Sequence, residues 1–182
     1  MDERNEYTCK ITLRGQLIRY RNGLADRPIL SRAVADKVLP IVHGNVMIYI
    51  SIGSEVCTDY LTDKLLAMDC VTVFAPYTCD GKITPLKLKS RGTPDGMGNL
   101  PHECYENSHI PSKIDFCITP LLGFNERGYR IGYGKGCYDR FFAEYCTFKV
   151  GLAFSGQAIK FVPEATDVPL DCCVTDKNVI YF

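Results

Sequence analysis

Short apolar runs alternate with longer stretches that carry a helical apolar period, and this alternation constrains the fold more than any other feature of the sequence. The strand-like runs lie at 46–51, 71–75, 114–119 and 149–154, with shorter ones near 172–175 and 179–182. Strands that alternate with helices form βαβ units and parallel sheets covered on both faces. The sequence therefore predicts a three-layer α/β fold with a mostly parallel sheet flanked by helices.

The stretches between the strands predict four helices, at 7–20, from a Ser31 cap to Pro40, from Thr58 through Leu66, and from near Gly136 through Phe142. The segment 77–111 is rich in Gly, Pro and Asn in its second half, so it is predicted as a long loop that could close over a ligand. Ligands of parallel sheets bind outside the carboxyl ends of the strands. That rule directs attention to Ser54, Glu55 and the residues after Pro120.

Length and charge exclude several classes of protein. The 182 residues suit one domain, 1–182, and 21 basic residues balance 21 acidic ones, so no global field attracts nucleic acid or a membrane surface. The charged start of the chain, residues 1–6, argues against a leader peptide, and the longest apolar run, 46–50, is too short to span a bilayer. We therefore expect a cytoplasmic monomer that binds neither nucleic acid nor membrane.

The cysteines are expected to be reduced thiols. Ten are present, but they show no Cys-x-x-Cys pair, and several lie within apolar runs such as Phe116-Cys117-Ile118. A disulfide scaffold is typical of short secreted chains, which this sequence does not resemble. No transition-metal site is predicted.

The segment from Asp115 to Arg140 carries the strongest chemical signal. A strand and a turn are followed by Gly132, Gly134 and Gly136, which alternate with larger residues just before a helix. Glycines allow the backbone to approach a ligand closely, and free N–H groups at a loop and a helix N-terminus bind phosphate oxygens. The spacing fits neither the P-loop pattern nor the dinucleotide fingerprint.

Charged residues surround this glycine-rich loop. Arg130, Lys135 and Arg140 are placed to neutralise phosphate charge, and Asp139, in the first turn of the predicted helix, is placed to hold Mg²⁺. Three glycines alone could simply form a tight loop. Together with the interleaved charges they predict a nucleotide-phosphate site.

The run R-I-G-Y-G-K-G-C-Y-D-R, preceded by a strand and G-F-N-x-x-G, resembles the signature of the 5-formyltetrahydrofolate cyclo-ligases. Shorter matches follow the family's order between Lys10 and Thr175. They are K-x-x-L-R at Lys10–Arg14, an acidic segment at Ser54–Thr58, G-L-A-x-x-x-Q ending at Gln157, and a stretch resembling P-x-E-x-H-D at Pro163–Asp167. The resemblance implies the sugar-phosphate isomerase/CoA-transferase-like fold.

The resemblance also implies roles for individual residues. Glu55 and Tyr133 would bind the folate, Asp139 and Asp167 would hold Mg²⁺, and Lys135 and Arg140 would act in catalysis. The residues expected to bind ATP are Lys10, Arg14, Arg130, Gly132, Tyr133, Gly134, Lys135, Gly136, Cys137 and Tyr138.

Four features depart from the family pattern. Asn125 stands where an aspartate is commoner, Cys137 where a tyrosine is usual and Thr166 where a histidine is frequent. The family's I-P-E-P loop appears only as Leu100-Pro101-His102-Glu103. The altered loop bears on the folate contacts, whereas the phosphate-binding and Mg²⁺-binding residue types are all present.

The implied reaction uses ATP and Mg²⁺ to convert 5-formyltetrahydrofolate, with or without a polyglutamyl tail, into 5,10-methenyltetrahydrofolate, ADP and phosphate. Phosphorylation of the formyl oxygen would activate it as a leaving group before N10 attacks, so positioning and charge stabilisation suffice. Two alternatives remain open. One is a folate- or nucleotide-binding module without turnover, and the other is a sugar-phosphate isomerase or CoA-transferase-like enzyme of the same fold.

Overall fold

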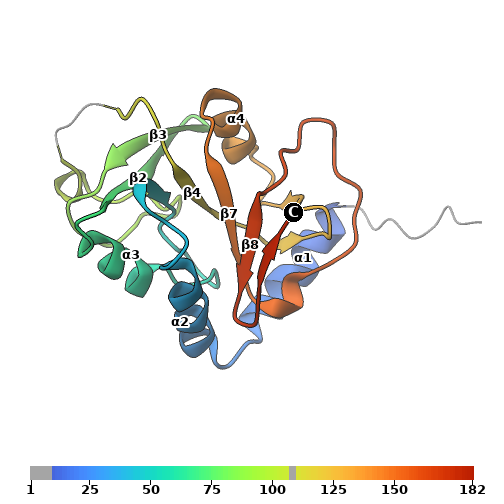
Figure 1. Cartoon of the computed structure of the whole chain (residues 1–182). Coiled ribbons are helices and arrows are strands. Elements are labelled where there is room, and N and C mark those ends of the chain that lie inside the picture. Colours follow the sequence, from blue (N-terminus) through green and yellow to red (C-terminus); the bar gives the residue numbers. More distant parts are fainter. Residues whose placement is uncertain (1–9, 107–109) are drawn as a thin grey trace, which may run out of the picture.

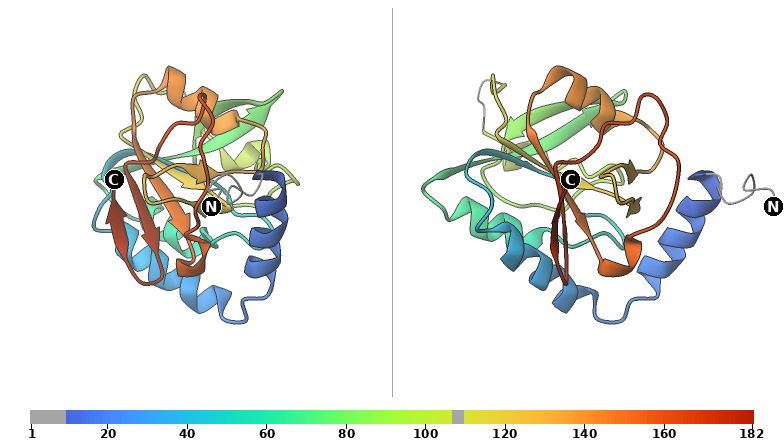
Figure 2. Two further views of the ribbon diagram at one scale, coloured as in Figure 1. Left: turned by 90° about the vertical axis from the view of Figure 1, so that its right-hand side faces the viewer. Right: turned by 45° about the vertical axis from the view of Figure 1, so that its right-hand side comes forward.

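The structure is a computed structural model that describes residues 10–106 and 110–182 (Figures 1 and 2). Residues 1–6, on which the expectation about a leader peptide rests, and the first part of the helix predicted from residue 7 lie outside the described residues. Within the described residues, no helix is both long and apolar enough to cross a membrane. The expectation of one domain from 1 to 182 stays a prediction.

Seven strands form one sheet in the order β3-β2-β1-β4-β7-β8-β9. The five central strands pair in parallel, and β3 and β9 pair antiparallel at the two edges. The strands are β1 Gly44–Ile48, β2 Val71–Cys79, β3 Lys82–Lys87, β4 Phe116–Pro120, β7 Phe148–Ala153, β8 Cys172–Thr175 and β9 Val179–Tyr181. The predicted mostly parallel sheet is confirmed.

The two faces of the sheet are buried against different helices. In β1, Val46 and Ile48 belong to a large apolar cluster with α2 (Arg27–Val38) and α3 (Asp59–Leu66). Met47 points to the other face and packs with Phe141 of α4 (Cys137–Glu144). Figure 1 shows α2 and α3 on the opposite side of the sheet from α4. Because side chains alternate along a strand, these fully apolar strands need cover on both faces.

A smaller unit stands beside the sheet and carries part of the site. Strands β5 (Gly123–Phe124) and β6 (Arg130–Ile131) form an antiparallel pair. Helix α1 (Lys10–Asn22) packs on it through Leu13 and Leu17, which contact a cluster containing Ile131. This hairpin lies where the sequence predicted only a turn and a glycine-rich loop.

The predicted start of the second helix was wrong. The second helix begins at Arg27 and not at Ser31, because Pro28 suits a first helical turn. The Ser31 hydroxyl instead accepts a hydrogen bond from the backbone N–H of Cys57. The third and fourth helices begin where they were predicted to begin, after Thr58 and after Gly136.

The segment predicted as a loop from residue 77 also contains regular structure. Strand β2 continues to Cys79 and turns at Asp80-Gly81 into β3. Both turn residues have positive φ, 47° and 75°, which is the conformation that an Asp-Gly pair favours in a two-residue hairpin. Between β3 and residue 106, the described chain is irregular apart from a short 3-10 helix at His102–Cys104 and an isolated bridge between Leu88 and Tyr105.

Candidate functional site

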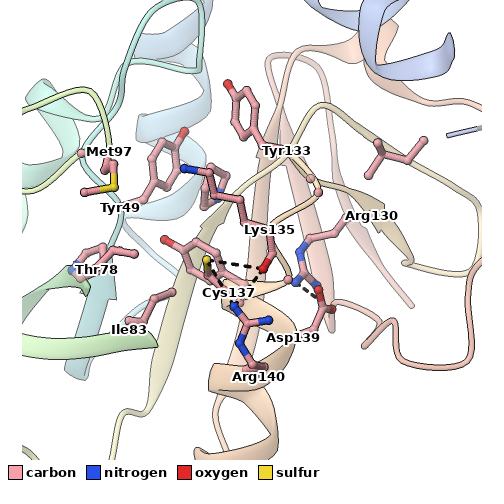
Figure 3. A pocket seen from close by; sticks show the side chains of 18 of the residues that line it. Tyr49, Thr78, Ile83, Met97, Arg130, Tyr133, Lys135, Cys137, Asp139 and Arg140 are labelled. Carbon is pink, nitrogen blue, oxygen red and sulfur yellow. Dashed lines mark hydrogen bonds and ion pairs between the residues drawn. The ribbon is translucent and has the colours of Figure 1, made fainter. Parts of the chain in front are cut away.

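One cavity of about 650 Å³ collects the residues that the sequence singled out (Figure 3). It lies beyond the carboxyl ends of the parallel strands, where Ile50 follows β1 and Pro120 ends β4. The predicted residues in its lining are Lys10, Arg14, Glu55, Arg130, Gly132, Tyr133, Gly134, Lys135, Gly136, Cys137, Tyr138, Asp139, Arg140 and Asp167. Segments far apart in the chain therefore meet at one site.

The glycine-rich loop between β6 and α4 has a conformation that other residues would adopt poorly. Gly134 and Gly136 have φ values of 95° and 64°. A Cβ atom on Gly134 would lie 3.2 Å from the Arg14 guanidinium. The loop then enters α4 directly, with Gly136 as the residue before the first helical turn. Backbone N–H groups at such a junction form a concave anion site.

Helix α1 brings two cations to this loop. Arg14 Nε donates a hydrogen bond to the backbone oxygen of Gly132 at 2.9 Å. The Lys10 ammonium lies 2.5 Å from Asp167 Oδ2 and 3.3 Å from Glu164 Oε1. The chain segment around Asp167 is thereby tied to the start of α1. Both cations line the cavity, and Arg14 contacts the glycine-rich loop directly.

Arg130 and Asp139 form a second charge pair in the cavity, as Figure 3 shows. Arg130 is buried, and one guanidinium nitrogen lies 3.0 Å from Asp139 Oδ1 while the other donates to the Val168 backbone oxygen at 2.9 Å. The same carboxylate oxygen accepts the Val168 N–H at 3.1 Å. Asp139 therefore joins α4 to β6 and to the segment after Asp167.

Asp139 and Asp167 were predicted to hold Mg²⁺, and each is paired with a cation in the structure. Among the described residues, no three metal-ligating side chains gather into a metal cluster. Mg²⁺ at nucleotide sites, however, takes one or two carboxylates and completes its shell with phosphate oxygens and water. Two carboxylates lining the same cavity fit that requirement, so the metal role of these residues stays a prediction.

Lys135 and Arg140 flank the centre of the loop. Figure 3 shows the Lys135 side chain extending from the loop into the cavity. The Arg140 guanidinium donates to the backbone oxygens of Gly81 at 2.7 Å and Lys135 at 2.9 Å. Arg140 therefore links the glycine-rich loop to the β2–β3 turn. The partly exposed Cys137 thiol lies nearby, 3.8 Å from the Lys135 oxygen.

Glu55 lies at the other end of the cavity and is only 7% exposed. Its Oε2 accepts the Ile52 N–H at 2.9 Å. Burial raises the pKa of Glu55 above its ordinary value, while the Ile52 N–H, the Tyr133 hydroxyl and the Arg21 cation oppose that rise. Burial likewise raises the pKa of Tyr133. A buried carboxylate beside a phenol can recognise a polar, ring-shaped ligand edge.

The wall that faces the glycine-rich loop contains no residue that the sequence singled out, although part of it lies in the segment 77–111, which was predicted as a loop able to close over a ligand. The wall consists of Tyr49, Ile50, Ile52, Pro76, Thr78, Ile83, Gly96, Met97 and Gly98. Figure 3 shows Tyr49, Thr78, Ile83 and Met97 on this side. The Asp-Gly turn was the available signal, because a β2–β3 hairpin necessarily places residues such as Thr78 and Ile83 beside the end of β1. An apolar wall opposite a cationic loop suits a ligand pair with one aromatic and one phosphorylated member.

The departures from the family pattern have different structural consequences. Asn125 is buried, and its oxygen accepts the N–H groups of Arg127 and Tyr129 while its amide donates to the Phe161 oxygen. It therefore shapes the β5–β6 turn and does not line the cavity. Thr166 does line the cavity. The residues Leu100–Glu103 do not line it, and the neighbouring Gly96, Met97 and Gly98 do.

Comparisons with known proteins agree on one family. The 5-formyltetrahydrofolate cyclo-ligase family model matches residues 7–176. A probable 5-formyltetrahydrofolate cyclo-ligase from Caenorhabditis elegans is 30% identical over 154 residues, 74% of each chain. The 5-formyltetrahydrofolate cyclo-ligase of Mycoplasma pneumoniae is 40% identical over 73 residues, which span 39% of this chain and 44% of that protein.

Solved structures show the same fold. The structure of the 5,10-methenyltetrahydrofolate synthetase from Aquifex aeolicus superposes with a TM-score of 0.78 at 28% identity and covers 96% of this chain and 93% of that one. The predicted α/β architecture is therefore confirmed both by the sheet itself and by a known relative.

Proposed function

The chain belongs to the 5-formyltetrahydrofolate cyclo-ligase family, and from that premise we propose that it converts 5-formyltetrahydrofolate to 5,10-methenyltetrahydrofolate with ATP as co-substrate. One observation supports this most directly. A single cavity has a glycine-rich cationic end beside an apolar end that contains a buried carboxylate. Such a cavity can hold a triphosphate and a folate together.

The phosphate end would act through charge and position. Lys10, Arg14, Lys135 and Arg140 line this part of the cavity and would neutralise the phosphate oxygens. Fixed cations in a partly enclosed site stabilise transferring phosphoryl groups without reorganisation during the reaction. Asp139 and Asp167 would hold Mg²⁺, whose positive charge would offset part of the phosphate charge. Asp167 is paired with Lys10, so this carboxylate would have to give up part of that ion pair to hold the metal.

The folate end would orient the reacting groups. Glu55 would accept hydrogen bonds from the ligand's ring edge, and the wall that contains Tyr49, Ile83 and Met97 would pack on its aromatic surface. This arrangement would direct the formyl oxygen toward the phosphate end. Holding two substrates in line lowers the entropic part of the barrier.

The chemistry would then proceed in two balanced steps. The formyl oxygen would attack the γ-phosphorus, the bond to the β–γ bridging oxygen would break, and ADP would leave. N10 would next attack the activated formyl carbon, the carbon–oxygen bond would break with release of phosphate, and N10 would lose its proton to solvent. None of these steps needs a covalent bond to the protein, and we assign no general base. We further propose that the protein works as a monomer in the cytoplasm.

The test is absorbance of the methenyl product after the protein is mixed with 5-formyltetrahydrofolate, MgATP or both. We expect a rise only with both substrates, and a loss of roughly a hundredfold or more in rate for Lys135→Ala, as is typical when a preorganised charge on a transferring group is removed. Lys177→Ala, outside the cavity lining, serves as the matched control and should keep the wild-type rate. A folded protein that binds both ligands but forms no product would contradict the proposal and favour a binding module.

A further inference from the structure

Arg21 is a buried cation whose surroundings are unusual. It lies in the last turn of α1 and is 2% exposed. Its guanidinium donates to the Leu121 backbone oxygen at 3.2 Å and to the Tyr133 hydroxyl at 2.7 Å. Its Nε–H group is buried and has no hydrogen-bond partner among the described residues. Burying an arginine that is incompletely satisfied costs stability, so a purely structural position would favour an apolar residue.

Arg21 acts electrostatically on the buried Glu55 and lowers the pKa of that carboxyl. The Tyr133 hydroxyl accepts a hydrogen bond from Arg21, and Tyr133 lines the same cavity as Glu55. Glu55 and Arg21 are both buried, whereas Tyr133 is 46% exposed and belongs to the glycine-rich loop (Figure 3). The buried cation therefore contacts a half-exposed phenol that shares a cavity with the buried acid.

The spacing of cations along α1 supports a functional role for Arg21. Lys10, Arg14 and Arg21 are separated by four and seven residues, so they lie on one face of the helix. Lys10 to Arg21 spans about 16 Å along the helix axis. The first two line the phosphate end of the cavity, and Arg21 contacts Tyr133 near Glu55.

We propose that Arg21 is a positioning residue for the folate end of the site: its hydrogen bond to the Tyr133 hydroxyl holds that side chain where Tyr133 and Glu55 meet the folate together. This inference rests on the proposed function, because it assigns the Glu55 end to the folate. It adds a residue that does not line the cavity and that acts through another side chain. Removing it should therefore affect one substrate and leave the other nearly unchanged.

The first test is the Arg21→Met variant, which keeps side-chain length and removes the charge. We expect KM for 5-formyltetrahydrofolate to rise about tenfold, the effect of losing roughly one charge-assisted hydrogen bond, and KM for ATP to change less than about twofold. The exposed Arg19→Met, on the same helix, is the matched control and should leave both constants unchanged.

The pH profile separates positioning from packing. The titratable and charged groups that face Glu55 are Tyr133, Arg21, Tyr49 and Tyr138. Of these, Arg21 is the cation that lowers the Glu55 pKa. The acidic limb of kcat/KM for the folate should therefore move to higher pH in Arg21→Met. Arg21→Lys should restore that limb but not the folate KM, because one ammonium cannot reproduce both guanidinium contacts.

A double-mutant cycle guards against a folding artefact. Tyr133→Phe removes the hydroxyl at a half-exposed position, and we expect it to raise the folate KM as Arg21→Met does, with little further effect when the two are combined. Additive effects, or equal changes in both KM values, would overturn the proposal. Calorimetry measures the binding of 5-formyltetrahydrofolate without ATP, and therefore tests the role of Arg21 even if the protein has no turnover. A failure of the proposed function can thus be told apart from a failure of the role assigned to Arg21. Unchanged folate affinity in Arg21→Met would contradict the role assigned to Arg21.

Discussion

The buried carboxylate of Glu55 lines the cavity but lowers the folding stability of the protein at neutral pH. Its carboxylate is buried, and the groups that favour its charged form do not fully offset the loss of water. An ionised side chain in such a place costs folding free energy, which evolution tolerates where a ligand needs it. The cost has a definite dependence on pH.

Because the pKa of Glu55 is raised above 4.5, the folded protein holds this proton more tightly than the unfolded chain does. The resulting stabilisation is complete below about pH 4.5 and is lost as pH rises through the raised pKa. We therefore predict that Glu55→Gln is more stable than the wild type at pH 7 and that the difference disappears toward pH 4. Urea unfolding at both pH values measures it.

The matched control for this prediction is Glu126→Gln, at an exposed position outside the cavity. Its stability should follow that of the wild type at both pH values. Equal stability of Glu55→Gln and wild type at pH 7 would contradict the prediction. The Glu55→Gln variant should also bind 5-formyltetrahydrofolate more weakly, since a neutral amide replaces a charged acceptor.

The charged residues of the glycine-rich segment that the sequence singled out line one cavity, and they could be recognised because their signal is local. Gly134, Lys135 and Gly136 belong to one short motif whose conformation and charge follow from neighbouring residues. Arg21 could not be found in the same way. Its role depends on a contact with Tyr133, 112 positions later in the chain, and no local pattern distinguishes it from the exposed Arg19.

At the scale of secondary-structure elements, α1 couples apolar packing to the phosphate end of the cavity. Leu17 is buried in the cluster that joins α1 to the β5–β6 hairpin, while Lys10 and Arg14 on the same helix line the cavity. A loss of packing there should displace the cations as well. Leu65 of α3 is also buried, but it belongs to the large apolar cluster that α2 and α3 form with the sheet.

We predict that Leu17→Ala and Leu65→Ala each lower the free energy of unfolding by about 2–4 kcal/mol, as is typical for buried leucines. Only Leu17→Ala should also raise KM for ATP, because the helix that it loosens carries Lys10 and Arg14. Urea unfolding and steady-state kinetics at a temperature where both variants are folded measure the two effects. An equal rise of KM in both variants would show that general destabilisation is responsible.

Strands and helices with a regular pattern of apolar residues could be predicted from the sequence. The hairpins, whose main signal is the turn between their strands, were not recognised. The apolar runs of β1, β4 and β7 are buried on both faces and therefore stand out in the sequence. The β2–β3 hairpin was missed because β3 contains Pro85 and few apolar residues, which left only the Asp80-Gly81 turn as a signal. The second helix begins before Ser31 because Pro28 suits the first turn of a helix, so Ser31 is not needed as a cap.

At the scale of the whole molecule, the parallel sheet explains how distant segments reach one cavity. Residues after β1 and β4 emerge at the same edge of the sheet, and the loop after β6, α1 and the segment around Asp167 complete the cavity lining. Any ligand that bridges these segments binds only the folded state. Binding should therefore increase the measured stability by mass action.

We predict that MgATP at 100 times its dissociation constant raises the free energy of unfolding by about 2.7 kcal/mol, and that Lys135→Ala reduces this gain at the same ligand concentration. Thermal or urea unfolding with and without MgATP measures it. ATP with a chelator should stabilise less than MgATP does. Equal stabilisation by the two would contradict the assignment of Asp139 and Asp167 as metal ligands.

The pairing of Lys10 with Asp167 and of Arg130 with Asp139 has one more consequence. Of the residues that the structure describes, five basic and four acidic ones line the cavity, so it is close to electroneutral before any ligand arrives. The negative charge of a free nucleoside triphosphate is much larger than this small positive excess. A nucleoside triphosphate bound to a divalent cation has a smaller negative charge, which comes closer to balancing the excess. We therefore expect the cavity to bind the nucleotide more tightly with its divalent cation than without it.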